Sequence, residues 1–384
     1  MYVLKKSSRA ILALILCVLI SFAGINRVSA TPSQLTAPAL SAKSAVLIDA
    51  LTGDILIEKN AHSRMAMAST TKIMTALVAA ERGDLDKAVS VHPSAIGVEG
   101  SSIYLFAGEK MTLRDLLYAM LLESANDAAA AIAIEIGGST QGFCDMMNAK
   151  AEELGLRDTH FKNPHGLYDD EHYTTAYELA KITREALRSE AIKTIVATKK
   201  MTITPIEGNT RVLRNHNKLL SFYEGAIGVK TGFTKKSGRC LVSAAERDGL
   251  TLIAVTINAP DDWNDHKRLL DAGFDNFEAI PLTKAGKVCY MLDVMGGDTT
   301  SVPLIYKDTL STTVKKGRKE DIGCVIETLN RFEFAPVMSG KTLGRAIFYL
   351  DGEKVGETDL VCAADVNFKK SSEGLFDKIK NIFT

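Results

Sequence analysis

A serine and a lysine three residues apart could supply a nucleophile together with its own base. Ser69-Thr70-Thr71-Lys72 is the only Ser-x-x-Lys segment in the chain. Positions i and i+3 of a helix share a face, so the two side chains can meet. Serine is a weak nucleophile until a base takes its proton, and a lysine kept neutral by burial and nearby cations can do so. About one such segment is expected by chance in a chain of this length, so alone it is equally typical of a helix cap followed by a surface lysine.

Two further segments narrow the chemistry. Ser124-Ala125-Asn126 lies where one helical pattern stops and another begins, a position that can expose polar side chains to a cleft. Lys230-Thr231-Gly232 starts a β-type segment that continues through Phe233 to Thr234, and its glycine allows a close approach to the backbone. Ser-x-x-Lys, Ser-x-Asn and Lys-Thr-Gly, in this order, form the motif set of penicillin-interacting serine enzymes.

With these motifs, the sequence resembles the low-molecular-mass penicillin-binding proteins, which are serine D-alanyl-D-alanine carboxypeptidases of the bacterial cell wall. Further family-like segments extend the resemblance over essentially the whole chain: Ala66–Thr75, Glu99–Leu105 with Gly108, Leu122–Ala128, Asn163–Leu167, Asn215–Leu220 and Gly228–Cys240. The resemblance implies an α/β (α+β) fold of the β-lactamase/transpeptidase type, in which helices and a helical subdomain flank an antiparallel sheet, with a small all-β domain appended. It also implies peptidoglycan stem peptides ending in D-Ala-D-Ala as substrate and β-lactam antibiotics as covalent inhibitors.

The resemblance further implies a role for the residues of the first two motifs. Ser69 would attack the carbonyl between the two D-alanines, with Lys72 as its base. Ser124 would relay a proton to the leaving amine, and Asn126 would bind the substrate backbone. Water would then release the shortened peptide from the acyl-enzyme.

The third motif would bind the substrate on the opposite side. Lys230 would hold positive potential, and Lys230 with Thr231 would bind the terminal carboxylate, a task that suits a cation beside a hydroxyl. Gly232 would let the substrate approach, and the backbone N–H of Phe233 would share the oxyanion with that of Ser69. Some relatives carry arginine where this chain has His216, which leaves the fine specificity for the wall peptide open.

Three other functions remain possible for a chain with these motifs. A β-lactamase of the related class places Glu-x-x-Leu-Asn before Lys-Thr-Gly, and no such segment occurs between Asn126 and Lys230. A DD-endopeptidase that cuts cross-links would use the same residues, so the sequence does not separate it from a carboxypeptidase. A non-catalytic wall-binding protein would not need the intact motif set.

A second polar cluster could bind a metal. It contains His160, His165, Asp169, Asp170, Glu171 and His172. No His-Glu-x-x-His segment is present, and Pro164-His165-Gly166-Leu167 is typical of a loop. We therefore expect loop or helix-cap roles for these residues, with no metal and no other cofactor.

The elements that must position the motifs can be predicted from periodicity and turn residues. Helices are predicted at Ser69–Ala80, at a capping box from Thr112 to Leu122, and at Asp127–Ile136, Gln141–Leu154, Thr175–Leu187 and Asp262–Phe277. Hairpins are predicted for Ala45–Leu51 with Asp54–Lys59, Lys200–Pro205 with Thr210–Arg214, and Gly238–Arg247 with Leu250–Ala259. The catalytic sheet would therefore be assembled from two distant parts of the sequence, with a helical insertion between them.

Beyond about residue 280, short β-type runs indicate a separate domain. They are Lys287–Leu292, Thr309–Val314, Cys324–Leu329, Arg345–Leu350 and Thr358–Ala363. The predicted organisation is a signal peptide at 1–30, a catalytic domain at 31–279, a small β-sandwich-like domain at 280–367 and an amphipathic tail at 368–384. Leu375, Phe376, Ile379, Ile382 and Phe383 share one helical face of that tail, so we expect it to bind a membrane surface.

The N-terminus and the charge balance place the protein outside the cytoplasm and away from nucleic acid. Lys5, Lys6 and Arg9 precede an apolar run to about Ile25, which is too short to span a bilayer, and Val28-Ser29-Ala30 fits a cleavage site. The remaining chain holds 42 basic and 46 acidic side chains, without the basic excess of a nucleic-acid binder. We expect export to the outer face of the bacterial cytoplasmic membrane or the cell wall. Its five cysteines, an odd number without close pairs, do not indicate a disulfide framework.

Overall fold

The computed structural model describes residues 34–369, which divide into two units. The first unit holds the described residues up to Lys284 together with Thr309–Glu320. The second holds Ala285–Asp308 together with the residues from Asp321 on. This division lies a few residues beyond the expected boundary at 279/280, and one later segment returns to the first unit. The expected signal peptide and almost all of the expected tail lie outside the described residues.

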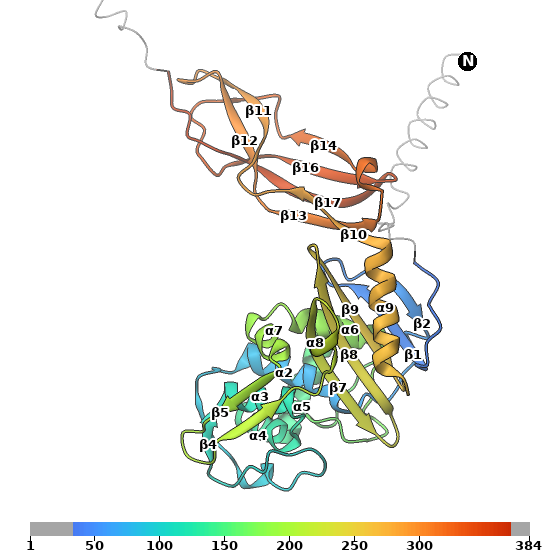
Figure 1. Cartoon of the computed structure of the whole chain (residues 1–384). Coiled ribbons are helices and arrows are strands. Elements are labelled where there is room, and N and C mark those ends of the chain that lie inside the picture. Colours follow the sequence, from blue (N-terminus) through green and yellow to red (C-terminus); the bar gives the residue numbers. More distant parts are fainter. Residues whose placement is uncertain (1–33, 370–384) are drawn as a thin grey trace, which may run out of the picture. The chain divides into compact units, whose positions relative to one another are not determined.

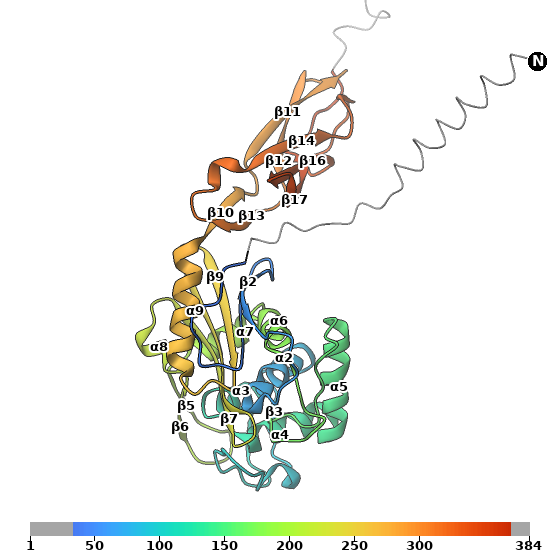
Figure 2. The same cartoon turned by 90° about the vertical axis from the view of Figure 1, so that its right-hand side faces the viewer.

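The first unit is built on a five-stranded antiparallel sheet. Its order is β2-β1-β9-β8-β7, with β1 (Ser44–Asp49), β2 (Ile55–Lys59), β7 (Ala226–Thr234), β8 (Gly238–Arg247) and β9 (Leu250–Ile257). Strands from the two ends of the unit thus lie side by side, which confirms the predicted sheet (Figure 1). Both faces are covered. The long α9 (Asp262–Asn276) and the short α8 (Leu219–Phe222) pack on one side, and the remaining helices lie on the opposite side (Figure 2). Alternate residues such as Val46 and Leu47 therefore belong to two different apolar cores.

The insertion between β2 and β7 is mainly helical. It contains η1 (Ala68–Thr71), α2 (Lys72–Arg82), η2 (Pro93–Ala95), α3 (Leu113–Leu122), α4 (Asn126–Gly137), α5 (Thr140–Glu153), α6 (Ala176–Ala186), α7 (Glu190–Ala197) and α8 (Leu219–Phe222). Two short hairpins, β3 (Ala88–Ser90) with β4 (Lys110–Thr112) and β5 (Lys200–Ile203) with β6 (Arg211–Arg214), complete it. The predicted helices and hairpins are confirmed, and α7 and α8 were not predicted.

The helix expected to begin at Ser69 has a different start. Ser69 lies in the short 3₁₀ helix η1, and the α-helix begins at Lys72. The hydroxyls of Thr70 and Thr71 donate to the carbonyls of Met67 and Ala68, at 2.6 and 2.8 Å. These local bonds satisfy backbone acceptors at the tight turn.

The second unit is an all-β domain with one six-stranded sheet. Its order is β14-β16-β17-β12-β11-β15, with β11 (Val288–Met295), β12 (Ser301–Tyr306), β14 (Gly323–Thr328), β15 (Phe332–Phe334), β16 (Thr342–Leu350) and β17 (Glu353–Cys362). This confirms the expected all-β domain. The separate pair β10 (Phe277–Thr283) and β13 (Leu310–Lys315) belongs to the first unit. β10, β12 and the short β15 were not predicted; β10 and β12 each contain a proline, Pro281 or Pro303, a residue that argues against a strand.

Candidate active site

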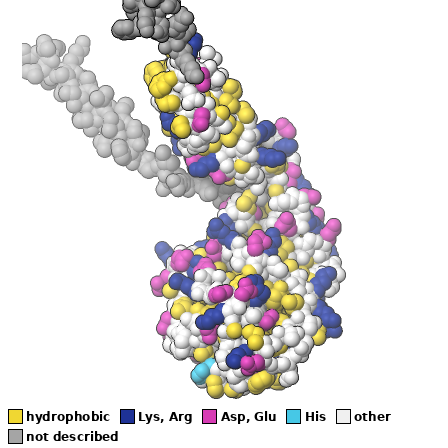
Figure 3. Space-filling view, turned by 90° about the vertical axis from the view of Figure 1, so that its left-hand side faces the viewer, with side chains coloured by type: hydrophobic (Ala, Val, Ile, Leu, Met, Phe, Trp, Pro, Cys, Tyr) yellow, Lys and Arg dark blue, Asp and Glu magenta, His cyan; other side chains and the backbone are white. Residues whose placement is uncertain are grey.

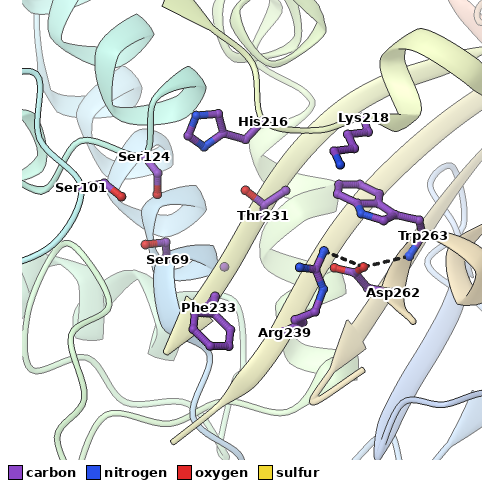
Figure 4. Close-up of a pocket in the computed structure, with 11 residues that line it drawn as sticks. Ser69, Ser101, Ser124, His216, Lys218, Thr231, Phe233, Arg239, Asp262 and Trp263 are labelled. Carbon is purple, nitrogen blue, oxygen red and sulfur yellow. Dashed lines mark hydrogen bonds and ion pairs between the residues drawn. The ribbon is translucent and has the colours of Figure 1, made fainter. Parts of the chain in front are cut away.

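A cleft in the first unit brings the three motifs together. In Figure 4, Ser69, Ser101 and Ser124 lie on one side, facing Thr231 and Phe233 of β7. The remaining lining residues are His216, Lys218, Gly232, Arg239, Asp262 and Trp263. Five of the eight predicted site residues therefore line the cleft. The other three, Lys72, Asn126 and Lys230, are buried, with at most 4% of each residue exposed.

Lys72 contacts the predicted nucleophile directly. Its Nζ lies 2.9 Å from Ser69 Oγ. The same nitrogen lies 2.6 Å from Asn126 Oδ1 and 2.6 Å from the backbone oxygen of His165. The Lys72 amine thus joins the first motif to the second. Its contact with Ser69 is the one that the i, i+3 spacing predicts.

The surroundings of that amine determine how its hydrogen atoms are used. An amide oxygen and a carbonyl oxygen only accept hydrogen bonds, so Asn126 and His165 each take one N–H of Lys72. A neutral amine has two N–H groups and one lone pair. With both N–H groups engaged, the lone pair is left for the Ser69 hydroxyl, which can then donate its proton along the 2.9 Å contact.

Burial and a neighbouring cation favour the neutral form of Lys72. Desolvation and the Lys230 charge hold the pKa of Lys72 well below its ordinary value, against a smaller opposing effect of Asp127. Burial also lowers the pKa of Lys230 to about 7, partly offset by Glu123. Its Nζ donates to the Thr231 carbonyl at 2.9 Å. The first lysine is therefore suited to act as a base, and the second is a cation that begins to lose its charge near neutral pH.

The second motif is positioned by a break between two helices. α3 ends at Leu122, and Ser124 has a φ of 60°, a left-handed conformation that interrupts the helix and turns the chain. Asn126 then starts α4, and its Nδ2 donates to the Glu99 carbonyl. Within residues 34–369, the Ser124 hydroxyl has no hydrogen-bond partner, and it is open to the cleft.

The third motif approaches the nucleophile through its glycine. A Cβ added to Gly232 would lie 3.1 Å from Ser69 N and 3.2 Å from Thr70 N. Such contacts are tighter than side chains normally make, so glycine lets β7 pass close to η1. Ser69 and Phe233 both line the cleft next to this close approach.

A loop that was not among the predicted site residues supports both Ser69 and Lys72. Gly166 has a φ of 91°, and a Cβ there would lie 1.9 Å from the Ala68 carbonyl oxygen. The Thr75 hydroxyl donates to the Pro164 carbonyl at 2.6 Å, which ties the loop to α2. The backbone carbonyl of His165 is then available to Lys72. The Asn-Pro-His-Gly-Leu segment is one of those that resemble the family. Its contact with Lys72 is made by a backbone carbonyl, so the side chains in the sequence gave no sign of this role.

His172 also supports the turn that carries the nucleophile. Its Nδ1 accepts from the Lys162 N–H at 3.0 Å, so its Nε2 is left to donate to Thr71 Oγ1 at 2.7 Å. Thr71 in turn donates to the Ala68 carbonyl. Burial lowers the pKa of His172 to about 4, so the ring is neutral and this chain of hydrogen bonds does not depend on pH near neutrality.

An arginine that sequence reasoning missed lies in the same cleft. Arg239 Nη2 contacts Asp262 Oδ1 at 2.8 Å, and the guanidinium lies 5.9 Å from the Trp263 ring (Figure 4). Asp262 is buried, whereas the Arg239 side chain is 43% exposed. The guanidinium is therefore held in place and still accessible from the cleft. Its position in a strand beyond the Lys-Thr-Gly motif gave no separate signal.

His216 lines the cleft and contacts a carboxylate. Its Nε2 lies 3.2 Å from Glu123 Oε2, and the other oxygen of Glu123 accepts from the Arg214 N–H at 2.6 Å. The hairpin of β5 and β6 is thus tied to the residue just before Ser124. This contact places His216 where its charge can affect a bound peptide.

The members of the second polar cluster have separate partners. His172 contacts Thr71, whereas His160 Nδ1 contacts the Glu171 carbonyl. His165 Nδ1 accepts from the Leu167 N–H, and burial lowers its pKa to about 3. Among residues 34–369, no three His, Cys, Asp or Glu side chains are arranged to hold a metal ion.

Comparison with known proteins shows which family the chain resembles. A family model for D-alanyl-D-alanine carboxypeptidases matches residues 31–261, and one for the C-terminal domain of penicillin-binding protein 5 matches residues 277–367. The D-alanyl-D-alanine carboxypeptidase DacF of Bacillus subtilis is 35% identical over 357 residues, which covers 88% of this chain and 91% of that protein. DacA of Escherichia coli is 30% identical, with 90% of this chain and 89% of that protein covered.

Solved structures show the same architecture. Penicillin binding protein 5 from Haemophilus influenzae has a TM-score of 0.69 at 30% identity, with 87% of this chain and 99% of that chain covered. A mutant of the Streptomyces K15 DD-transpeptidase has a TM-score of 0.60 at 33% identity, with 62% of this chain and 99% of that chain covered. The second match therefore corresponds in length to the first unit alone.

Proposed function

The chain belongs to the D-alanyl-D-alanine carboxypeptidase family, and we propose that Ser69, Lys72 and Ser124 carry out its reaction. The protein is a serine-type carboxypeptidase that removes the terminal D-alanine from peptidoglycan stem peptides, and penicillin inhibits it covalently. One observation supports the residue assignment above all others. The buried Lys72 Nζ lies within hydrogen-bond distance of two fixed acceptors and of Ser69 Oγ, so its neutral form can present its lone pair to that hydroxyl.

Acylation begins at Ser69. Lys72 takes the hydroxyl proton while Ser69 Oγ forms a bond to the carbonyl carbon between the two D-alanines. The N–H groups of Ser69 and Phe233 hold the developing oxyanion, a contribution worth several kcal/mol in such sites. Ser124, whose hydroxyl opens into the cleft beside Ser69, gives its proton to the leaving D-alanine amine and regains one from Lys72, so the proton taken from Ser69 leaves with D-alanine. Water then hydrolyses the ester and restores Ser69.

The substrate carboxylate binds on the β7 side of the cleft. Lys230 supplies positive potential, and Thr231 supplies a hydroxyl. Arg239 adds an exposed guanidinium on the neighbouring strand β8, oriented by Asp262. Guanidinium groups bind carboxylates with two parallel hydrogen bonds, so we assign Arg239 to the same anion. Asn126 Oδ1 accepts a hydrogen bond from Lys72. Asn126 therefore positions Lys72 in addition to its proposed contact with the substrate backbone.

A DD-endopeptidase activity would use the same cleft, because only the leaving group differs. The alternative of a β-lactamase needs a base that activates water for deacylation. The acid that lines the cleft, Asp262, is paired with Arg239. We therefore expect the penicilloyl ester at Ser69 to hydrolyse slowly.

The remaining parts of the chain are proposed to place this chemistry at the cell wall. Residues 1–30 would direct export, 31–279 would form the catalytic domain and 280–367 the β domain. The tail 368–384 would bind the outer face of the cytoplasmic membrane. The two matched family segments support the domain limits, and among residues 34–369 no helix is both long and apolar enough to cross a bilayer.

The nucleophile can be tested with one substitution. Purified residues 31–384 should release D-alanine from a diacyl-tripeptide ending in D-Ala-D-Ala and should retain labelled penicillin. Ser69→Ala should abolish both, with an unchanged thermal melt, because no other side chain can form the ester. Stoichiometric labelling of the Ser69→Ala protein would falsify the assignment. A cross-linked muropeptide in the same assay measures any endopeptidase activity.

A further inference from the structure

The second unit carries an exposed apolar surface at the point where the described chain ends. Its members are Met295, Phe332, Phe334 and Phe368, whose exposed fractions are 53%, 43%, 69% and 65%. We call this surface the apolar end. Figure 3 shows hydrophobic side chains gathered in the upper part of the C-terminal domain. Isolated exposed apolar residues are ordinary, but adjoining ones mark an interaction site.

Backbone contacts show that these residues adjoin one another. β11 and β15 pair in parallel, with Met295 opposite Phe334. The rings of Phe332 and Phe334 meet edge to face with centroids 5.3 Å apart. Phe368 bridges to Gly297, two residues beyond Met295. Residues in register on parallel strands share a face, so Met295 and Phe334 point to the same side of the sheet.

The position of the chain exit indicates what covers this surface. The Lys369 N–H donates to the Gly296 carbonyl at 2.9 Å, so the tail begins inside the apolar end. A helix over the tail would carry five apolar residues on one face, and the sequence from residue 368 on holds four lysines against two acids, a composition typical of a helix that lies in a lipid surface. Any surface that binds the tail also holds the apolar end beside it at high local concentration.

We propose that the apolar end is a second lipid-contacting surface, which inserts its aromatic and methionine side chains into the bilayer interface next to the tail. The proposal rests on the membrane association proposed above. Aromatic side chains are favoured at that depth. The nearby charges are of both signs, with exposed Asp293 in register with Phe332 and Arg331 just before it. The contact should therefore depend on apolar burial and respond weakly to salt, unlike a basic tail.

Vesicle flotation of four proteins separates the two contacts. They are residues 31–384, the truncation 31–369, and each of these with Phe332→Thr and Phe334→Thr. Threonine keeps the strand propensity of β15. Vesicles of phosphatidylcholine, with and without phosphatidylglycerol, are used at low and high salt. Val325→Thr is the matched control, because it removes an exposed apolar side chain from β14, the opposite edge of the same sheet.

The double substitution should lower the partition constant of residues 31–384 by about tenfold or more, because the exposed parts of the two rings together amount to roughly one phenyl group. The factor should be similar at both salt concentrations. Val325→Thr should change nothing. Circular dichroism and D-alanine release should be unaltered in the proteins with Phe332→Thr and Phe334→Thr and in Val325→Thr. A bromine-labelled lipid should also quench the tryptophan introduced by Phe334→Trp, in a Trp263→Phe background.

Equal partition of the double variant and its parent in both backgrounds would overturn the lipid surface, even where truncation alone abolishes flotation and supports the tail. If truncation has no effect but the double variant loses binding, the apolar end stands and the tail contact fails. Self-association of the parent that the double variant abolishes, measured by sedimentation without lipid, would instead make this surface an interface between copies of the chain.

Discussion

Replacing Asn126 by aspartate tests whether Lys72 acts as a neutral base. The change keeps the shape of the side chain but places a carboxylate oxygen where Lys72 now donates to an amide oxygen, 2.6 Å away. A carboxylate favours the ammonium form of Lys72, whereas burial and Lys230 favour the neutral amine. Because only the neutral amine can take the Ser69 proton, Asn126→Asp should slow acylation in a manner that depends on pH.

The size of the effect follows from the geometry. At this separation, and with an effective dielectric constant of about 20, two unit charges attract by about 6 kcal/mol. The desolvation cost of a second buried charge offsets a large part of this attraction. If roughly half survives, the rising limb of the acylation profile moves up by about two pH units, since one unit corresponds to about 1.36 kcal/mol. At pH values on the rising limb of both proteins, the rate should then differ by roughly a hundredfold.

The measurement is the second-order rate constant for labelling by a fluorescent penicillin, taken from pH 5 to pH 10. Asn126→Asp should reach any given fraction of its maximal rate at a higher pH than wild type, and should recover activity as the pH rises. Asn126→Ala is the control, because it removes the amide without adding charge and should slow acylation without displacing the limb. If Asn126→Asp keeps the wild-type pH profile, Lys72 is not the base.

Four further outcomes are expected. Lys72→Arg should not restore acylation, because arginine keeps its proton; near wild-type labelling would show that another base acts. The KM for a D-Ala-D-Ala peptide should rise as the pH increases through about 7, because Lys230 loses its charge there; a flat KM through this range contradicts the proposed carboxylate role. Gly166→Ala should destabilise the protein by about 1–3 kcal/mol and slow labelling, as judged by melting and labelling together. Gly138→Ala, at a glycine of similar φ with no atom within 4 Å of the added Cβ, should leave labelling intact. Activity should survive dialysis against a strong chelator. If activity were lost and zinc restored it, the reaction would depend on a metal bound at the second polar cluster.

Local patterns in the sequence predicted most of the fold correctly. The Thr112 capping box begins α3, with the Thr112 hydroxyl accepting from the Asp115 N–H. Gly137 and Gly138 end α4, where Gly138 adopts a left-handed conformation. Such signals depend on a few neighbouring residues, so helix ends can be predicted from them without knowledge of the tertiary structure. α7 was missed because it is a single short amphipathic helix between two other elements.

The site was predicted by motif, and the parts that were missed lie between motifs. Ser69 and Lys72 are linked by helix geometry, which spacing alone can indicate. The carbonyl of His165 reaches Lys72 only because Gly166 packs against Ala68, a contact between segments about a hundred residues apart in the chain. Arg239 enters the cleft because β8 pairs with β7 in a register that places it opposite Phe233. The register between two strands depends on the tertiary structure, so composition and spacing do not predict it.

The two buried lysines of the cleft are suited to different tasks because of what surrounds each amine. Lys230 Nζ donates to the carbonyl of its own neighbour, so it is not in place to take the Ser69 proton. Lys72 Nζ contacts Ser69 Oγ, and the Lys230 charge is one of the two causes that lower the pKa of Lys72. Interacting buried cations titrate as a pair, and a proton on Lys230 therefore keeps Lys72 free of one. The same proton attracts the substrate carboxylate. The Lys230 charge thus contributes both to the lowered pKa of Lys72 and to recognition of the chain end. As Lys230 loses this charge at higher pH, the carboxylate contact should weaken, whereas burial, the larger cause, still favours the neutral Lys72 amine.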